Sequence, residues 1–87
     1  RGDHAHLDCW QTLVCIRGNL DILVDDGDSK KNFLLNDYGQ AISVPPGFWC
    51  AQNYSPMSSL MVLCSHLYNE KDYLRDYKEF LDYKGKK

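Results

Sequence analysis

Short apolar runs separated by turn-forming residues fill most of this chain, and this pattern limits the fold more than any other feature. The runs expected to form strands are Trp10–Ile16, Leu20–Val24, Asn32–Leu35, Ala41–Val44, Phe48–Tyr54 and Ser59–Cys64. Strands this short, punctuated this regularly by turns, are typical of a β-sandwich or barrel. No helical crossover segment lies between them, which argues against a parallel α/β sheet.

Two glycine-containing turns indicate how the first strands connect. Gly18-Asn19 stands between the first two runs and predicts a tight hairpin. Asp25-Asp26-Gly27 ends the second run with the strongest turn signal in the sequence. We interpret the aspartate pair as turn chemistry rather than a paired-carboxylate site, because aspartates in turns bond to their own backbone.

The residues after position 68 follow a helical period. Asn69 followed by Asp72 resembles a helix N-cap with an acidic third residue, and apolar residues then recur at three- and four-residue spacing. The sequence therefore predicts one C-terminal α-helix over about 69–83, which ends near Gly85. On such a helix, Asp72, Arg75 and Asp76 are expected to form ion pairs on the exposed surface.

Length and composition exclude several classes of protein. The 87 residues suffice for one domain, 1–87, with strands over about 3–65 before the helix. A net charge of −2 argues against nucleic-acid binding, and no apolar stretch is long enough to cross a membrane. Four cysteines without a CxxC pair argue against a zinc knuckle, and we expect a reducing, cytoplasmic setting. Because so small a barrel has edges to cover, a homodimer is expected.

The candidate site is His4-Ala5-His6, just before the first apolar run. Residues i and i+2 of a strand point to the same face, so both imidazoles are expected to enter one cavity. The alternative is a pair of surface histidines at a frayed terminus. The chain begins at Arg1, directly on this motif, and we expect a natural N-terminal segment to precede it.

The spacing after the histidines follows a longer pattern. Its members are His4, His6, Gln11 and Gly18, then Gly39, Pro45, Gly47 and Cys50. This order resembles the two cupin signatures, H-x-H-x3–4-E-x6-G and G-x5-P-x-G-x2-H, and implies an all-β, cupin-type jelly-roll barrel (a double-stranded β-helix). Gln11 replaces the metal-binding carboxylate and Cys50 the late histidine, so we expect no metal. A zinc or copper site of His4, His6 and Cys50 stays open as the alternative.

A narrower resemblance covers nearly the whole chain. The segments that carry it are RGDHAH at 1–6, LVCIRG at 13–18, DDG at 25–27, VPPGFW at 44–49, MVLCS at 61–65 and YNEKDYLRDYKEFL at 68–81. Together they resemble the WxcM-like sugar-nucleotide 3,4-ketoisomerases of dTDP-deoxysugar biosynthesis. The resemblance implies an isomerase that moves a keto group between C4 and C3 of a dTDP-linked 4-keto-6-deoxyhexose, through an enediolate and without a metal or other cofactor.

The resemblance also implies roles by position. His6 is expected to be the base that carries the proton, with His4 orienting the sugar or donating to its oxygen. Arg1 is expected to bind pyrophosphate or sugar oxygens, and Gln11 to line the pocket. Trp49 is expected at the mouth of the pocket, with core packing as the alternative.

Cys50 stands where the family usually has a histidine, and it is expected to line the same pocket. This departure leaves two other functions open. One is a metal-binding small-molecule cupin, such as a dioxygenase, that uses His4, His6 and Cys50. The other is a non-catalytic domain that binds a dTDP-sugar without turning it over.

Overall fold

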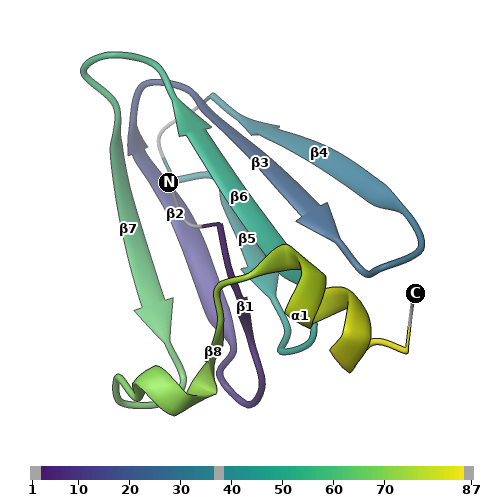
Figure 1. Ribbon diagram of the computed structural model, residues 1–87. Helices are drawn as coiled ribbons and strands as arrows, with labels where there is room; N and C mark the ends of the chain where they lie inside the picture. Colours follow the sequence, from purple (N-terminus) through teal and green to yellow (C-terminus); the bar gives the residue numbers. More distant parts are fainter. Residues whose placement is uncertain (1–2, 37–38, 86–87) are drawn as a thin grey trace.

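The computed structural model describes residues 3–36 and 39–85, and Figure 1 shows strands throughout with a short helix near the C-terminus. The strands are β1 (Ala5–His6), β2 (Gln11–Arg17), β3 (Leu20–Asp25), β4 (Lys30–Leu35), β5 (Ala41–Val44), β6 (Trp49–Tyr54), β7 (Ser59–Cys64) and β8 (Tyr73–Leu74). The helical elements are a 3-10 turn at Glu70–Asp72 and the helix α1 (Tyr77–Tyr83). Neither has the length and apolar character needed to span a membrane within the described ranges.

Two antiparallel sheets of three strands face each other across the core (Figure 1). One has the order β5-β2-β7 and the other β4-β3-β6. Side chains from both sheets form one buried cluster of Leu13, Cys15, Leu20, Ile22, Leu35, Val44 and Cys50. Alternate residues of β2 and of β3 enter this cluster, as expected for a sheet with one buried face. The all-β jelly-roll prediction, with one C-terminal helix, is confirmed.

The two glycine turns behave differently. The Asp25-Asp26-Gly27 prediction is confirmed, because β3 and β4 form a hairpin there and the Gly27 amide donates to the Asp25 carboxylate at 2.8 Å. The hairpin predicted at Gly18-Asn19 is wrong, because β2 and β3 lie in different sheets. Gly18 does turn the chain, with φ of 84°, but the turn leads from one sheet to the other. A local turn signal does not report which distant strands pair.

The C-terminal helix is shorter than the predicted 69–83, and its first half is replaced by other structure. Asn69 caps a single 3-10 turn. Tyr73 and Leu74, which follow this turn, form β8 and pair with β1. Backbone groups that are bonded to a neighbouring strand cannot continue a helix. A second cap at Asp76, whose side chain accepts from the Lys78 amide, then begins α1 at Tyr77.

The helix α1 closes a second apolar cluster. Its buried members are Ala5, Trp49 and Phe80. The Tyr77 hydroxyl donates to the buried Asp25 carboxylate at 2.5 Å, which ties the helix to the end of β3. This packing holds the C-terminal segment, and with it β8, against the rest of the molecule.

Candidate active site

The His4-Ala5-His6 segment lies between two strands from distant parts of the chain. On one side, His4 and Cys50 exchange backbone hydrogen bonds of 3.2 and 2.9 Å, which attach the segment to β6. On the other side, β1 pairs with β8, and His6 stands opposite Tyr73. Ala5 enters the cluster beneath α1, so the two histidines point to the opposite face of the segment.

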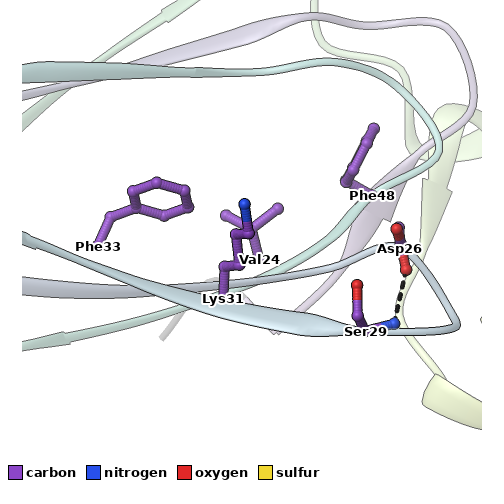
Figure 2. Close-up of a pocket in the computed structure, with 6 residues that line it drawn as sticks. All are labelled: Val24, Asp26, Ser29, Lys31, Phe33 and Phe48. Carbon is purple, nitrogen blue, oxygen red and sulfur yellow. Dashed lines mark hydrogen bonds between the residues drawn. The ribbon is translucent and has the colours of Figure 1, made fainter.

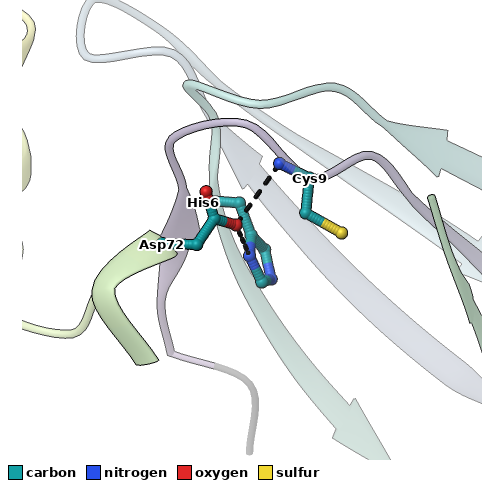
Figure 3. A group of neighbouring side chains, drawn as sticks. All are labelled: His6, Cys9 and Asp72. Carbon is teal, nitrogen blue, oxygen red and sulfur yellow. Dashed lines mark hydrogen bonds and ion pairs between the residues drawn. The ribbon is translucent and has the colours of Figure 1, made fainter. Parts of the chain in front are cut away.

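The two imidazoles contact each other and a carboxylate. His4 Nε2 lies 3.2 Å from His6 Nε2. His6 Nδ1 lies 2.8 Å from Asp72 Oδ2 (Figure 3). The ring of Tyr73 packs against both, with centroid distances of 4.4 Å to His6 and 5.1 Å to His4. His6 is buried and His4 is half-buried. The side chains of Asp72, His6 and His4 therefore form one hydrogen-bonded series.

Asp72 is a site residue that the sequence analysis misses. Its expected position on an exposed helix face is wrong, because the helix begins only at Tyr77. Arg75, expected on the same face, pairs with Glu70 at 2.8 Å. Asp72 and His6 are 66 residues apart in the chain, so no local pattern connects them.

Backbone amides from the turn after β1 also bind the Asp72 carboxylate. Asp8 N donates to Oδ1 at 2.6 Å and Cys9 N to Oδ2 at 3.3 Å. Partial burial raises the pKa of this carboxyl, but the hydrogen bonds from His6 and the two amides outweigh it and hold the pKa below its usual value. Asp72 is therefore an anion at neutral pH.

Gln11 and Cys50 lie beside His4. Burial and the neighbouring His6 lower the pKa of His4 to about 4, against an opposing side-chain hydrogen bond with Gln11. Gln11 is 7% exposed and Cys50 1% exposed. Burial also raises the pKa of the Cys50 thiol, so this side chain is a neutral thiol rather than a thiolate. Gln11 and Cys50 are therefore neutral neighbours of His4, whereas the charged Asp72 carboxylate lies beside His6.

Trp49 does not lie with the histidines. It is 8% exposed and packs in the cluster beneath α1, edge-on to Tyr77 at 5.2 Å and against Phe80 at 5.7 Å. Its neighbour Cys50 faces the other core, because successive residues of a strand point to opposite faces. The pocket-mouth role is therefore wrong for Trp49, and the alternative, core packing, is what the fold uses. Arg1 lies outside the described residues.

One group of metal-binding side-chain types comes together within the described part of the chain. His6, Cys9 and Asp72 bring ligand atoms within 4.8 Å of one another (Figure 3). It differs from the alternative set of His4, His6 and Cys50. Because His6 and Asp72 already share a hydrogen bond, we interpret the group as a hydrogen-bonded unit.

A cavity of about 130 Å³ borders His6, Asp72 and Tyr73. Residues 66–69 separate it from a more open cleft of about 410 Å³ that also reaches Asp72. A third hollow, of about 280 Å³, lies beside β3 and β4, where Lys31 and Phe33 stand across from Phe48 (Figure 2). Among the histidines of the described ranges, His6 lines the first cavity and His66 lines the first two, whereas His4 lines none of the three.

Comparison with known proteins identifies the family of the chain. A family model described as "FdtA: WxcM-like, C-terminal" matches residues 1–85. The TDP-4-oxo-6-deoxy-alpha-D-glucose-3,4-oxoisomerase of Aneurinibacillus thermoaerophilus is 36% identical over 87 residues, which cover 99% of this chain and 63% of the relative.

Solved structures give the same result. A 3,4-ketoisomerase from Helicobacter canadensis matches with a TM-score of 0.93 and 36% identity, over 98% of this chain and 65% of that one. The sugar 3,4-ketoisomerase QdtA from Thermoanaerobacterium thermosaccharolyticum, in complex with TDP, matches with a TM-score of 0.92 and 31% identity, over 98% and 63%. The chain thus spans just under two thirds of these relatives, and it belongs to the FdtA, WxcM-like C-terminal family.

Proposed function

We propose that this protein is a sugar-nucleotide 3,4-ketoisomerase that acts on a dTDP-linked 4-keto-6-deoxyhexose. Support comes from family membership and from relatives whose names state this activity. The single observation that carries the proposal is the pair of imidazoles in contact at 3.2 Å, one of which, His6, bonds to a carboxylate and lines a cavity with it.

The reaction needs a group that moves one proton between neighbouring carbons. Removal of the proton from C3 leaves its electron pair to form the C3=C4 bond, and the C4 carbonyl becomes an enediolate oxygen. The proton then returns at C4 while the hydroxyl proton on O3 moves to O4, which leaves the carbonyl at C3. A neutral imidazole can accept a proton and return it, and one positioned base can serve both carbons.

The contacts of the two rings favour a division of labour. Both ring nitrogens of His6 have partners, Asp72 on one side and His4 on the other. His4 is half-buried and contacts the neutral side chain of Gln11. We therefore assign the exchange with the sugar to His4 and the stabilisation of the transferred proton to His6, which reverses the roles expected from sequence.

Donors for the enediolate oxygens come from the same neighbourhood. Gln11 supplies an amide next to His4, and hydrogen-bond donors aimed at developing negative charge stabilise such intermediates without a metal. We expect Cys50, whose backbone bonds to His4, to line the same pocket. Arg1 remains our proposed partner for the pyrophosphate, because a guanidinium binds phosphate oxygens in a bidentate manner.

We also propose a homodimer in the cytoplasm. β7 ends its sheet within the described residues, and its side chains Met61 and Leu63 are 43% and 54% exposed, so a second copy has an apolar edge to cover. All four cysteines are free thiols, which suits a reducing compartment. Light scattering during size exclusion tests the dimer: a monomeric mass contradicts it.

The activity is tested by proton NMR of dTDP-4-keto-6-deoxyglucose incubated with the protein. We expect the 3-keto isomer to accumulate, and His6→Asn to slow its formation by about 10²-fold or more while circular dichroism stays unchanged. Asp21→Asn, on an exposed residue of β3, is the control and retains the wild-type rate. A rise in melting temperature with the nucleotide sugar but no isomer would contradict the enzyme and favour a binding domain.

A further inference from the structure

We infer that Asp72 is a positioning residue that sets the tautomer of His6, and through it the nitrogen at which His4 can take a proton. The inference rests on the proposed isomerase function and adds to it a residue from the C-terminal segment.

The backbone fixes Asp72 on both sides. Its amide donates to the carbonyl of Asn69 at 2.9 Å, which closes the 3-10 turn, and its own carbonyl accepts from the Leu7 amide at 2.9 Å. The two residues that follow form β8 and pair with β1. The turn and the strand pair together hold the carboxylate over His6, so its position does not depend on one flexible side chain.

The chemistry of a carboxylate allows one arrangement of protons on His6. Asp72 is an anion at neutral pH and can only accept hydrogen bonds. Its Oδ2 lies 2.8 Å from His6 Nδ1, so that nitrogen must carry a proton. In the neutral ring, Nε2 of His6 then carries no proton, and its lone pair faces His4.

This assignment extends to His4. The Nε2 atoms of the two histidines are 3.2 Å apart, so with a lone pair on His6 the shared proton belongs to His4 Nε2. His4 Nδ1 is then the basic nitrogen. When Nδ1 takes a proton from C3, the Nε2 proton of His4 can pass to His6, and the positive charge comes to rest beside the Asp72 anion. No side chain has to move for this transfer.

An amide in place of the carboxylate reverses the direction of both hydrogen bonds, the one between residue 72 and His6 and the one between His6 and His4. In Asp72→Asn, the carbonyl oxygen keeps the short bond from Asp8 N, and the NH₂ group turns toward His6 Nδ1. His6 must then hold its proton on Nε2 and donate it to His4 Nε2, which puts the remaining His4 proton on Nδ1. His4 has lost its acceptor. In serine proteases, the equivalent Asp→Asn change imposes the wrong tautomer and lowers kcat about 10⁴-fold.

A structural role for Asp72 has to be separated from this one. Asp72 also anchors the turn after β1 through the Asp8 and Cys9 amides. A loss of stability in an Asp72 variant is therefore no evidence about the tautomer of His6. The tautomer itself is visible in two-bond and three-bond proton–nitrogen NMR correlations of the imidazole rings, without substrate and without any assay of activity. Wild-type His6 is expected in the Nδ1–H form. Wild-type His6 in the Nε2–H form would overturn the inference whatever the variants do.

The kinetic test compares Asp72→Asn with Asp76→Asn. Asp76 is exposed and its side chain accepts from the Lys78 amide, away from both histidines, so it controls for the loss of one carboxylate in the same segment. For Asp72→Asn we expect the Nε2–H form of His6, a fall in kcat of about 10²-fold or more and little change in KM. Asp76→Asn should match wild type in both readouts.

The outcomes distinguish the inference from the function on which it rests. If Asp72→Asn keeps the wild-type tautomer and kcat while His6→Asn is inactive, the positioning role is wrong and the isomerase proposal stands. If His6→Asn retains full activity, the isomerase proposal fails in the form given above, and the tautomer measurement on wild type still judges the role of Asp72.

Discussion

His4 and His6 meet edge to face, with their ring planes at 86° and their Nε2 atoms 3.2 Å apart. Two cationic imidazoles cannot share this distance without strong repulsion in a half-buried site. Burial first, and then the charge of His6, lower the pKa of His4 to about 4 from an ordinary value near 6.5. His4 is therefore neutral at physiological pH.

This shift predicts how stability depends on pH. Between pH 6.5 and about 4, the unfolded chain binds a proton at residue 4 that the folded chain does not bind, so the free energy of unfolding falls as pH falls through this window. Above the window, both states are neutral there and the effect vanishes. Urea unfolding followed by circular dichroism at pH 7.5 and 5.0 measures the loss. His4→Asn should reduce it, and an equal loss in both proteins would contradict the assignment.

The cluster beneath α1 predicts a stability effect of a different kind. Phe80 is fully buried against Trp49, so Phe80→Ala should lower the free energy of unfolding by about 3–5 kcal/mol. Leu67→Ala is the control, because Leu67 is 94% exposed and its truncation should cost less than about 0.5 kcal/mol. Similar losses in the two variants, measured by urea unfolding, would show that α1 does not pack here.

The turn between the sheets allows a test of close packing. Gly18 has φ of 84°, and a Cβ there would lie 2.2 Å from Ser58 Oγ and 2.8 Å from Ser58 Cα. Gly39 has nearly the same φ, 88°, and a Cβ at Gly39 would meet no atom of the described residues within 4 Å. Gly39→Ala is therefore a matched control for backbone strain.

We expect Gly39→Ala to cost about 1–2 kcal/mol, the usual penalty for a side chain in the left-handed region. Gly18→Ala should cost clearly more, because Ser58 also has to move from its hydrogen bonds with Asn19. Thermal unfolding of the two variants measures the difference. Equal melting temperatures would mean that the contact with Ser58 adds nothing.

Metal removal gives a prediction about the chemistry. Gln11 offers a neutral amide, and the Cys50 thiol stays protonated because burial raises its pKa, so neither is a strong ligand beside His4. Dialysis against EDTA should therefore leave kcat unchanged, and elemental analysis should find well under one ion per chain. Loss of activity that zinc restores would support the metal-binding alternative instead.

The sequence predicts the strands well because its signals are local. Ala41–Val44 and Ser59–Cys64 form strands with the bounds expected from their apolar residues and flanking turns. The i, i+2 spacing of His4 and His6 likewise suffices to place both rings together. In both cases, the geometry depends on residues that are neighbours in the chain.

The errors concern contacts between distant residues. The hairpin at Gly18 fails because β2 finds its partners in β5 and β7, far along the chain. The helix expected from Asn69 fails because β8 pairs with β1. The same pairing brings Asp72 to His6, so the missed site residue and the misplaced helix have one cause.

Exchange of the C3 hydrogen tests the central claim most directly. When dTDP-4-keto-6-deoxyglucose is incubated with the protein in D₂O, a base at C3 should remove that proton and exchange it with solvent. Deuterium then enters at C4 as the 3-keto isomer forms, or at C3 when the enediolate reverts to substrate, and proton NMR detects both the isomer and the loss of the C3 proton signal. We predict both changes with wild type and neither with His4→Asn or His6→Asn. Persistence of the C3 proton with wild type would contradict proton transfer by the histidine pair. Exchange in the two variants at the wild-type rate would contradict it as well.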